Sequence, residues 1–384
     1  MLKSIQIKNF KAVQNSKAIR LTPLTVFIGN NGSGKSSIIE ALETYQAIVT
    51  SDLDLAMIPW RGFEYIRNQA VSRKLQRTNG DRPYASNPTE FNLLWPNYRA
   101  TMNITARAGG DELLIQKEQI DIKSKGVIYR SSNGKVSYPD GEKSKLSTIT
   151  FDLPNGLSCV PFVDNELNID LHKNITQWQF LNLNPSAMLN PTPQKRSGGQ
   201  IHLARNGSNI AEYLLSIQSN DLSAFVGIFE ALQYVLPYAS DLQPKITSEL
   251  ERSVYLQLTE ADFKVPSWLF STGTLRILAL LAVLRHPTPP PLIIIEEVEN
   301  GLDPRTIHLI VEEIRNVVES GLSQVILTTH SPYLLDLLPL SQIVLVERDS
   351  KGEPCFTRPA NQKSLNTWAE QFTPGKLYTM GKLS

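Results

Sequence analysis

A glycine-rich stretch directly after an apolar run constrains the fold of this chain more than any other sequence feature. The stretch reads FIGNNGSGKSS and spans 27–37. An ordinary turn needs one or two glycines or asparagines, whereas this stretch holds three glycines, two asparagines and a lysine. We therefore expect a loop whose backbone is folded around a ligand. An ordinary glycine turn is the alternative.

The loop fits the pattern GxxxxGK[ST] of a phosphate-binding P-loop. Its glycines let successive backbone N–H groups point towards phosphate oxygens, and the helix that follows adds its dipole. We expect Lys35 to contact the β- and γ-phosphates and the Ser36 hydroxyl to bind Mg²⁺. A strand-like run over 18–28 and helical spacing from 37 supply the required strand, loop and helix.

Length and composition narrow the class of protein. The 384 residues are 41% hydrophobic, enough for one large domain or two ordinary ones, and the net charge of +1 gives no overall basic character. The two cysteines have no metal or disulfide spacing, and the N-terminus lacks the apolar core of a signal peptide. No apolar run approaches the roughly 20 residues of a membrane helix. We expect a cytoplasmic protein.

Residue patterns predict one domain over 1–384 with three regions. The region 1–165 holds the P-loop and an antiparallel β meander, and 166–265 holds a small helical lobe, with an exposed loop over 185–200. In 266–384, helices over 272–285 and 306–319 alternate with wholly apolar strands. This alternation predicts a buried parallel sheet.

Two adjacent carboxylates, Glu296 and Glu297, end the apolar strand PLIIIEE. Ligands of α/β folds bind at the carboxyl ends of strands. One carboxylate is therefore a candidate for holding Mg²⁺ and the other for orienting an attacking water. A helix cap or a surface acidic pair is the alternative.

Two small-residue turns complete the candidate chemistry. FSTGTLR opens an apolar helix, and a plain Ser271 N-cap explains it equally well. QVILTTHSP brings His330 to the end of a buried strand, from which it could contact a γ-phosphate. A purely structural histidine is the alternative.

Together these motifs resemble the ABC-type ATPases in order and spacing. IEEVENGLDP, LFSTGTLRILALL, LTTHSPYLLD and NFKAVQNSKAIRLTPLTVFIGNNGSGKSS are similar, more narrowly, to the SMC/RecF/OLD branch. The resemblance covers 1–60 and 200–350. It implies an α/β P-loop NTPase fold of ABC type, with a mostly parallel core sheet, an antiparallel meander and a small helical lobe. It also implies a slow ATPase whose turnover depends on self-association or on a partner.

The resemblance also implies roles for single residues. The nucleotide loop comprises Asn30, Asn31, Gly32, Ser33, Gly34, Lys35, Ser36 and Ser37. Glu296 would join Ser36 at the metal, while Glu297, His330 and Lys35 would act in catalysis. Lys11 lies where family members present a basic residue near the nucleotide.

The resemblance implies that the remaining motif residues act across a dimer interface. Ser271 and Gly273 would form a signature turn that contacts ATP held by a second subunit, and Asp303 would belong to the loop that crosses the interface. Two chains would then close around ATP as a homodimer, or assemble further, and hydrolysis would release them.

Such a switch is expected to act on DNA or to gate a separate effector such as a nuclease, in phage defence or DNA repair. The residues after 340 lack the clustered acids of an OLD-type Toprim nuclease, so we expect no nuclease activity in this chain. A transporter subunit is an alternative, although FSTGT departs from LSGGQ. A non-hydrolysing scaffold is another, because Glu296 stands where these enzymes usually have Asp.

The segment 61–82 is locally basic, with six Arg or Lys residues against two acids. Aromatic side chains are interleaved with them. A nucleic-acid backbone could bind there, and a solvated helix or loop is the alternative.

Overall fold

The computed structural model describes most of the chain. The described residues are 1–70, 75–76, 84–85, 87–107, 112–122, 126–130, 134–139, 148–167, 170–195, 201–248, 251–362, 365 and 371–383. The chain divides into two compact units. Unit 1 comprises Met1–Thr22, Ile28–Trp178 and Val344–Thr357, and unit 2 comprises Pro23–Phe27, Gln179–Ile343 and Arg358–Ser384.

Unit 1 is built on an antiparallel sheet with the strand order β12-β11-β10-β9-β8-β7-β1-β2, with β3 paired to β1. The strands are β1 (Ser4–Phe10), β2 (Val13–Asn15), β3 (Ile19–Arg20), β7 (Thr89–Leu94), β8 (Tyr98–Ala106), β9 (Leu113–Ile122), β10 (Gly126–Arg130), β11 (Lys135–Pro139) and β12 (Thr148–Asp152). Every second residue of β7 is buried, as expected for a sheet that covers a core with one face. The predicted antiparallel meander is confirmed.

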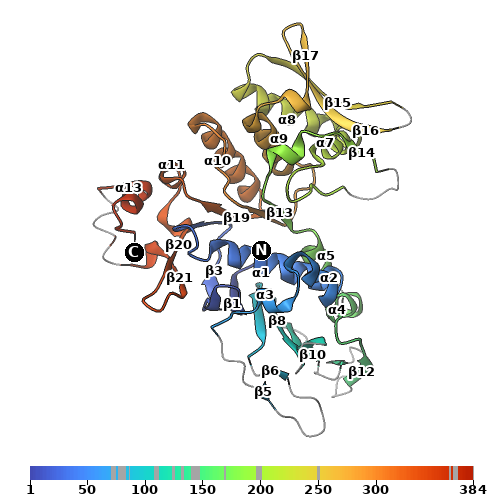
Figure 1. The fold of residues 1–384 in the computed structure, drawn as a ribbon, viewed down its shortest axis with the longest axis vertical. Helices are drawn as coiled ribbons and strands as arrows, with labels where there is room; N and C mark the ends of the chain where they lie inside the picture. The colour runs from blue at the N-terminus through green and yellow to red at the C-terminus, as the bar shows by residue number, and fades with distance from the viewer. Residues whose placement is uncertain are drawn as a thin grey trace. The chain divides into compact units, whose positions relative to one another are not determined.

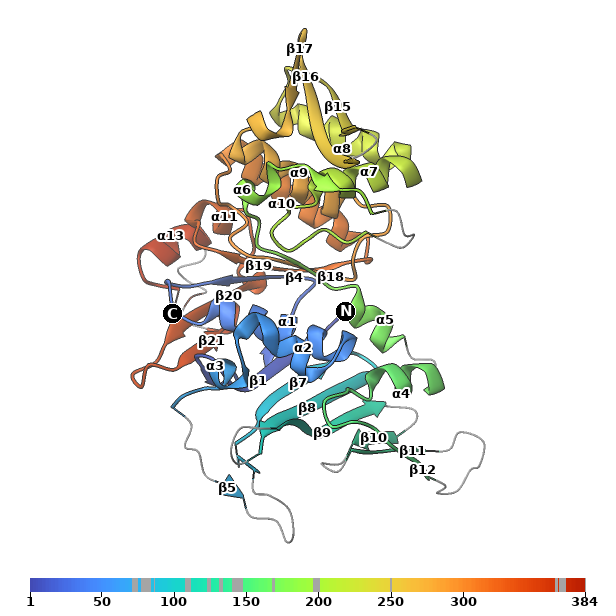
Figure 2. The ribbon, with the colours of Figure 1, turned by 45° about the vertical axis from the view of Figure 1, so that its right-hand side comes forward.

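Helix α1 (Lys35–Thr50) packs on this sheet (Figure 2). Its fully buried Tyr45 lies against Phe91 of β7, with ring centroids 5.8 Å apart, and against Trp178 at 6.4 Å. These rings fix the helix that begins at the P-loop. The other elements of unit 1 are α2 (Leu53–Met57), η1 (Ile58–Trp60), α3 (Phe63–Ile66), β5 (Leu75–Gln76), β6 (Tyr84–Ala85), α4 (Val160–Leu167), α5 (Leu171–Thr176), most of β20 (Ile343–Arg348), and β21 (Pro354–Thr357).

Unit 2 contains the parallel strands expected from the apolar runs. β13 (Gln179–Leu181), β18 (Leu292–Ile295) and β19 (Gln324–Thr329) pair in parallel, and β4 (Leu24–Ile28) lies next to β19. All residues of these four strands are buried, which explains why their sequences are largely apolar. The α/β fold class predicted from the sequence is confirmed.

Helices and a second sheet complete unit 2. The helices are α6 (Pro185–Met188), α7 (Ile210–Asn220), α8 (Leu222–Val235), η2 (Ser267–Leu269), α9 (Thr272–Leu284), α10 (Pro304–Glu319), α11 (Pro332–Asp336), η3 (Leu340–Gln342), η4 (Pro359–Asn361) and α13 (Pro374–Thr379). The second sheet is antiparallel and comprises β14 (Thr192–Pro193), β15 (Ala239–Ile246), β16 (Ser253–Glu260) and β17 (Phe263–Pro266).

The small lobe therefore holds more than the predicted helices. α7 and α8 pack on the sheet of β15 and β16, so the lobe is mixed rather than helical (Figures 1 and 2). The residues of β16 alternate between buried and half-buried positions. That period of two is a strand signal that the helical interpretation left out. The expected loop 185–200 also differs, because it contains α6 and β14 in its described part.

Candidate functional site

The P-loop of unit 1 requires glycine at two positions for steric reasons. It follows β4 and leads into α1. A Cβ atom on Gly29 would lie 2.0 Å from the carbonyl oxygen of Val346, and one on Gly34 would lie 2.8 Å from Cγ of Pro354. Gly34 also has a φ of 114°, which side-chain-bearing residues rarely adopt. The glycines that the sequence pattern marked are thus required by close approach.

The polar groups of the loop suit a phosphate. Nζ of Lys35 donates to the carbonyl oxygens of Gly29 at 2.7 Å and Asn30 at 3.0 Å, so the ammonium group is held within the loop. The buried hydroxyl of Ser33 has no hydrogen-bond partner among the described residues. Ser36 is exposed at the first turn of α1. A glycine cradle, an unpartnered hydroxyl and an ammonium group together fit a polyphosphate. The other loop residues divide by exposure, with Asn30, Asn31 and Gly32 exposed and Gly34 and Ser37 buried.

Lys11 lies beside the P-loop helix. Its ammonium forms an ion pair with Glu40 of α1 at 2.8 Å and sits 3.8 Å from the ring centroid of Trp60. Glu40 comes four residues after Ser36, so the two side chains share one face of α1. Unit 1 thus brings Lys11 to the same helix face as the candidate metal ligand.

In unit 2, polar side chains gather where parallel strands end. Glu296 follows β18, and its carboxylate is largely buried. Oε1 of Glu296 accepts a hydrogen bond from Nη2 of Arg205 at 2.7 Å and a longer one from Nδ2 of Asn182 at 3.4 Å. Asn182 follows β13, the strand next to β18. Because ligands of α/β folds bind at the carboxyl ends of parallel strands, the sequence could have indicated Asn182 as a site residue. Arg205 lies in a loop, and no sequence motif marks it as a site residue.

Glu297 occupies a strained backbone position. Its φ is 48°, in the left-handed region that residues other than glycine seldom adopt. Its N–H donates to Oγ1 of Thr328 at 2.9 Å, and Nδ2 of Asn300 donates to its Oε2. The side chain is exposed. The turn therefore directs an ionisable group outwards from the end of a buried strand.

Glu299 connects the acidic turn to His330. The backbone N–H of His330 donates to Oε1 of Glu299 at 2.6 Å, while the buried Oε2 has no partner in the described part of the chain. Burial lowers the pKa of Arg276, and the negative charges of Glu297 and Glu299 partly offset this effect. Unit 2 thus brings Glu297, Glu299, His330 and Arg276 into one cluster. Glu299 and Arg276 were not predicted from the sequence.

The signature turn (271–274) and the Asp303 loop pack against each other. Oγ of Ser271 accepts from the N–H of Thr274 at 3.0 Å and caps α9, and Asp303 caps α10 by accepting from the N–H groups of Arg305 and Thr306. A Cβ atom on Gly273 would lie 3.0 Å from the carbonyl oxygen of Gly301. A cavity of about 320 Å³ is lined by both segments. The capping role anticipated for Ser271 is real, and its side chain is also exposed.

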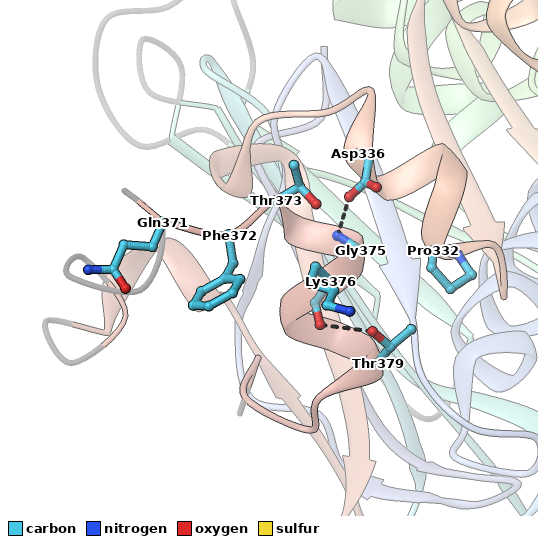
Figure 3. A pocket seen from close by; sticks show the side chains of 8 residues that line it. All are labelled: Pro332, Asp336, Gln371, Phe372, Thr373, Gly375, Lys376 and Thr379. Atoms are coloured by element: carbon cyan, nitrogen blue, oxygen red, sulfur yellow. Dashed lines mark hydrogen bonds between the residues drawn. The ribbon is translucent and has the colours of Figure 1, made fainter.

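A second cavity, of about 420 Å³, lies between α11 and α13 (Figure 3). Oδ1 of Asp336 accepts from the N–H of Gly375 at 2.6 Å. A Cβ atom on Gly375 would lie 2.0 Å from the carbonyl oxygen of Pro332, so the two helices are in direct contact. Since Pro332 comes two residues after His330, α13 supports the turn that carries the histidine.

The described residues give little support to a metal site built from clustered ligands or to a nucleic-acid contact at the basic segment 61–82. In the described ranges, no group of three or more His, Cys, Asp or Glu side chains could hold a metal ion. Ser36 belongs to unit 1 and Glu296 to unit 2. Much of the basic segment 61–82, including Arg73, Lys74 and Arg77, lies outside the described residues. Among the described helices, none is long and apolar enough to cross a membrane.

Two family models match the chain. The model described as "AAA domain, putative AbiEii toxin, Type IV TA system" matches 183–336, and the model described as "AAA ATPase domain" matches 1–48. The first match contains the signature turn, the acidic strand and His330, and the second contains the P-loop.

Two curated relatives align over most of the chain. An OLD nuclease of Thermus scotoductus is 21% identical over 397 residues, covering 98% of this chain and 68% of that protein. An ATP/GTP phosphatase of Helicobacter pylori is 22% identical over 365 residues, covering 88% of this chain and 87% of that protein.

Solved SMC head structures share the fold. An SMC head bound to the C-terminal winged-helix domain of ScpA has a TM-score of 0.50 at 15% identity, covering 93% of this chain and 97% of that one. An SMC head with an extended coiled coil, bound to the C-terminal domain of ScpA from Pyrococcus furiosus, has a TM-score of 0.51 at 14% identity and covers 96% and 98%.

Proposed function

We propose that this chain, a P-loop ATPase of the SMC/RecF/OLD branch, is an ATP-driven switch that dimerises around ATP. The observation that carries the proposal is the packing of the signature turn on the Asp303 loop, with Gly273 against Gly301. Both segments line one cavity of unit 2. The exposed Ser271 hydroxyl at the start of α9 is a candidate contact for the phosphates of ATP bound by a second subunit.

The P-loop would hold the nucleotide through its backbone N–H groups, the Lys35 ammonium and the Ser33 hydroxyl. Ser36 and Glu296 would hold Mg²⁺, whose charge stabilises the charge that develops on the transferred phosphoryl group. Lys11, placed on the same face of α1 as Ser36, would add a second positive charge beside the phosphates.

Glu297 would orient the attacking water. Its exposed carboxylate is held by Asn300, and its backbone by Thr328, so the group is fixed before the reaction begins. His330 would contact the γ-phosphate, with its backbone held by Glu299. Arg276 lies near enough to Glu297 and Glu299 to counter their charge. Separate oriented groups of this kind are what in-line attack on a phosphate requires.

The decisive experiment measures size and turnover together. Wild type, Glu297→Gln and the exposed control Glu319→Gln are sized by light scattering with and without Mg-ATP, and phosphate release is followed in parallel. Glu297→Gln should accumulate as a dimer with ATP and lose turnover by at least about a hundredfold, because it binds ATP without activating water. Wild type and Glu319→Gln should turn over and dimerise only transiently. If all three proteins keep one size and release no phosphate, the switch is wrong.

A second candidate is a scaffold that binds ATP without turnover. The ion pair between Arg205 and Glu296 favours it, because the guanidinium already neutralises the carboxylate proposed for the metal. Dimerisation of wild type with ATP, without phosphate release, would identify the scaffold.

The ligand of the switch is proposed to be DNA or an effector of the nuclease class, in phage defence or DNA repair in the cytoplasm. The similarity to an OLD nuclease and to a toxin-family AAA domain supports this setting. DNA binding should weaken steeply between about 50 and 200 mM salt, because phosphate contacts release counterions. Copurification from the native host tests for an effector.

A further inference from the structure

A hairpin late in the sequence lies against the P-loop within unit 1. β20 and β21 pair antiparallel, with Arg348 opposite Pro354 at the end of the ladder. The connecting turn is closed by Asp349, whose Oδ1 accepts from the N–H groups of Lys351 and Glu353. The hairpin already accounts for two of the loop's glycines, because Val346 faces Gly29 and Pro354 faces Gly34.

Arg348 connects this hairpin to the crown of the P-loop. Its Nε donates to the carbonyl oxygen of Gly32 at 2.8 Å, and its Nη1 donates to the carbonyl oxygen of Gly352 at 2.5 Å. One planar guanidinium therefore bonds the loop and the hairpin turn at once. Such a fork holds geometry more firmly than a single flexible donor does.

Gly32 needs this support because packing does not hold it. A Cβ atom on Gly32 would meet nothing within 4 Å, and its φ of 73° lies where glycine moves freely. The peptide between Gly32 and Ser33 is instead held by hydrogen bonds at both ends. Its carbonyl accepts from Arg348, and its N–H donates to the carbonyl of Asn30 at 3.1 Å.

We propose that Arg348 is a positioning residue for phosphate binding. By holding the Gly32 carbonyl outwards, it keeps the crown of the loop in one conformation, so that the loop is ordered before a nucleotide arrives. Ordering a binding loop in advance raises affinity, since binding then costs less conformational entropy. The inference rests on the proposed function only in taking a nucleotide as the ligand of this loop.

The test compares Arg348→Gln and Arg348→Lys with Lys351→Gln. Lys351 is a matched control, because it carries the same charge on the same hairpin and is exposed. The probe is a fluorescent methylanthraniloyl ATP with Mg²⁺. Arg348→Gln should raise its Kd roughly tenfold, the size expected when a charge-assisted hydrogen bond is lost, with KM raised similarly and kcat within about twofold. Arg348→Lys should be intermediate, and Lys351→Gln should match wild type.

A second measurement needs no nucleotide. Hydrogen exchange of the amides over 30–34 should be faster in Arg348→Gln than in wild type or Lys351→Gln. Unchanged exchange together with unchanged Kd overturns the inference, and so does an equal loss of affinity in Arg348→Gln and Lys351→Gln, since charge alone would then explain it. If Arg348→Gln is unfolded by its melting curve, Arg348→Lys supplies the same comparison. Wild type that binds no nucleotide would overturn the proposed function, while the exchange rates would still decide the role of Arg348.

Discussion

Gly273 lies close against Gly301: a Cβ atom added to Gly273 would stand 3.0 Å from the carbonyl oxygen of Gly301. The first residue belongs to the signature turn and the second to the segment that leads to Asp303. Two motifs that are separate in the sequence are thus one contact surface, and a change at either should move both.

Gly273→Ala tests this coupling. The added methyl group would push the signature turn away from the Gly301 carbonyl by a few tenths of an ångström, while alanine favours the helix in which it lies. We expect the free energy of unfolding to stay within about 1 kcal/mol of wild type. ATP-dependent dimerisation, measured by light scattering, should weaken about tenfold. Gly227→Ala in α8, where the Cβ position has ordinary contacts, is the matched control. Equal dimerisation of the two variants would contradict the coupling.

Glu297→Gly should raise the stability of the fold and abolish phosphate release. Glycine adopts the φ of 48° without the steric cost that Glu297 bears, so the free energy of unfolding should rise by up to about 1 kcal/mol. Phosphate release should be lost, as in Glu297→Gln, which keeps the backbone strain. Urea unfolding of both variants gives the comparison. A glycine variant that unfolds more easily than the glutamine variant would show that the strain is absent.

The Arg205–Glu296 ion pair should show a measurable coupling energy. Glu296 is buried while the Arg205 side chain is 36% exposed, so solvent screens part of the attraction. A double-mutant cycle of Arg205→Met and Glu296→Gln, followed by urea unfolding, should give about 1–2 kcal/mol. A coupling energy near zero would mean that Glu296 finds another partner when Arg205 is removed.

Asp303 should stabilise the fold in a pH-dependent way. The Thr306 hydroxyl, and then the backbone N–H groups of Thr306 and Arg305, hold the pKa of Asp303 below its ordinary value. Its stabilising effect should therefore be complete above an ordinary pKa near 3.8 and be lost as the pH falls through the lower folded-state pKa.

Asp303→Ala should accordingly cost about 1 kcal/mol at pH 7 and pH 5, with the cost shrinking below about pH 4. Asp303→Asn keeps the cap without the ionisable group, so its stability relative to Asp303→Ala should not depend on pH. Urea unfolding at several pH values measures both. If the loss of unfolding free energy caused by Asp303→Ala grew as the pH falls, the expected direction of the pH dependence would be wrong.

Local patterns predicted the parts of the fold that local rules determine. The helices expected over 272–285 and 306–319 are found at Thr272–Leu284 and Pro304–Glu319, because Ser271 and Asp303 cap them and Pro304 starts the second. The apolar runs before Glu296 and His330 are buried strands.

Partners that come from distant segments could not be predicted. Nothing near Arg205 marks it as the partner of Glu296, because that pairing depends on how a loop crosses the end of β18. Arg348 looks like an ordinary charge at the end of a strand until the hairpin register is known. The positive φ of Glu297 could not be predicted either, because glycine is the residue that this backbone conformation favours and the sequence has glutamate there.

The contact between Arg348 and Gly32 joins residues 316 positions apart. A ribosome synthesising this chain would make the glycine loop long before the hairpin that orders it, so the loop must wait until the hairpin has been synthesised. Such distant pairings form slowly and leave unfinished surfaces exposed meanwhile. A nascent chain would consequently bind nucleotide poorly until the hairpin emerges, and only polypeptides that already include the hairpin could enter an ATP-dependent assembly.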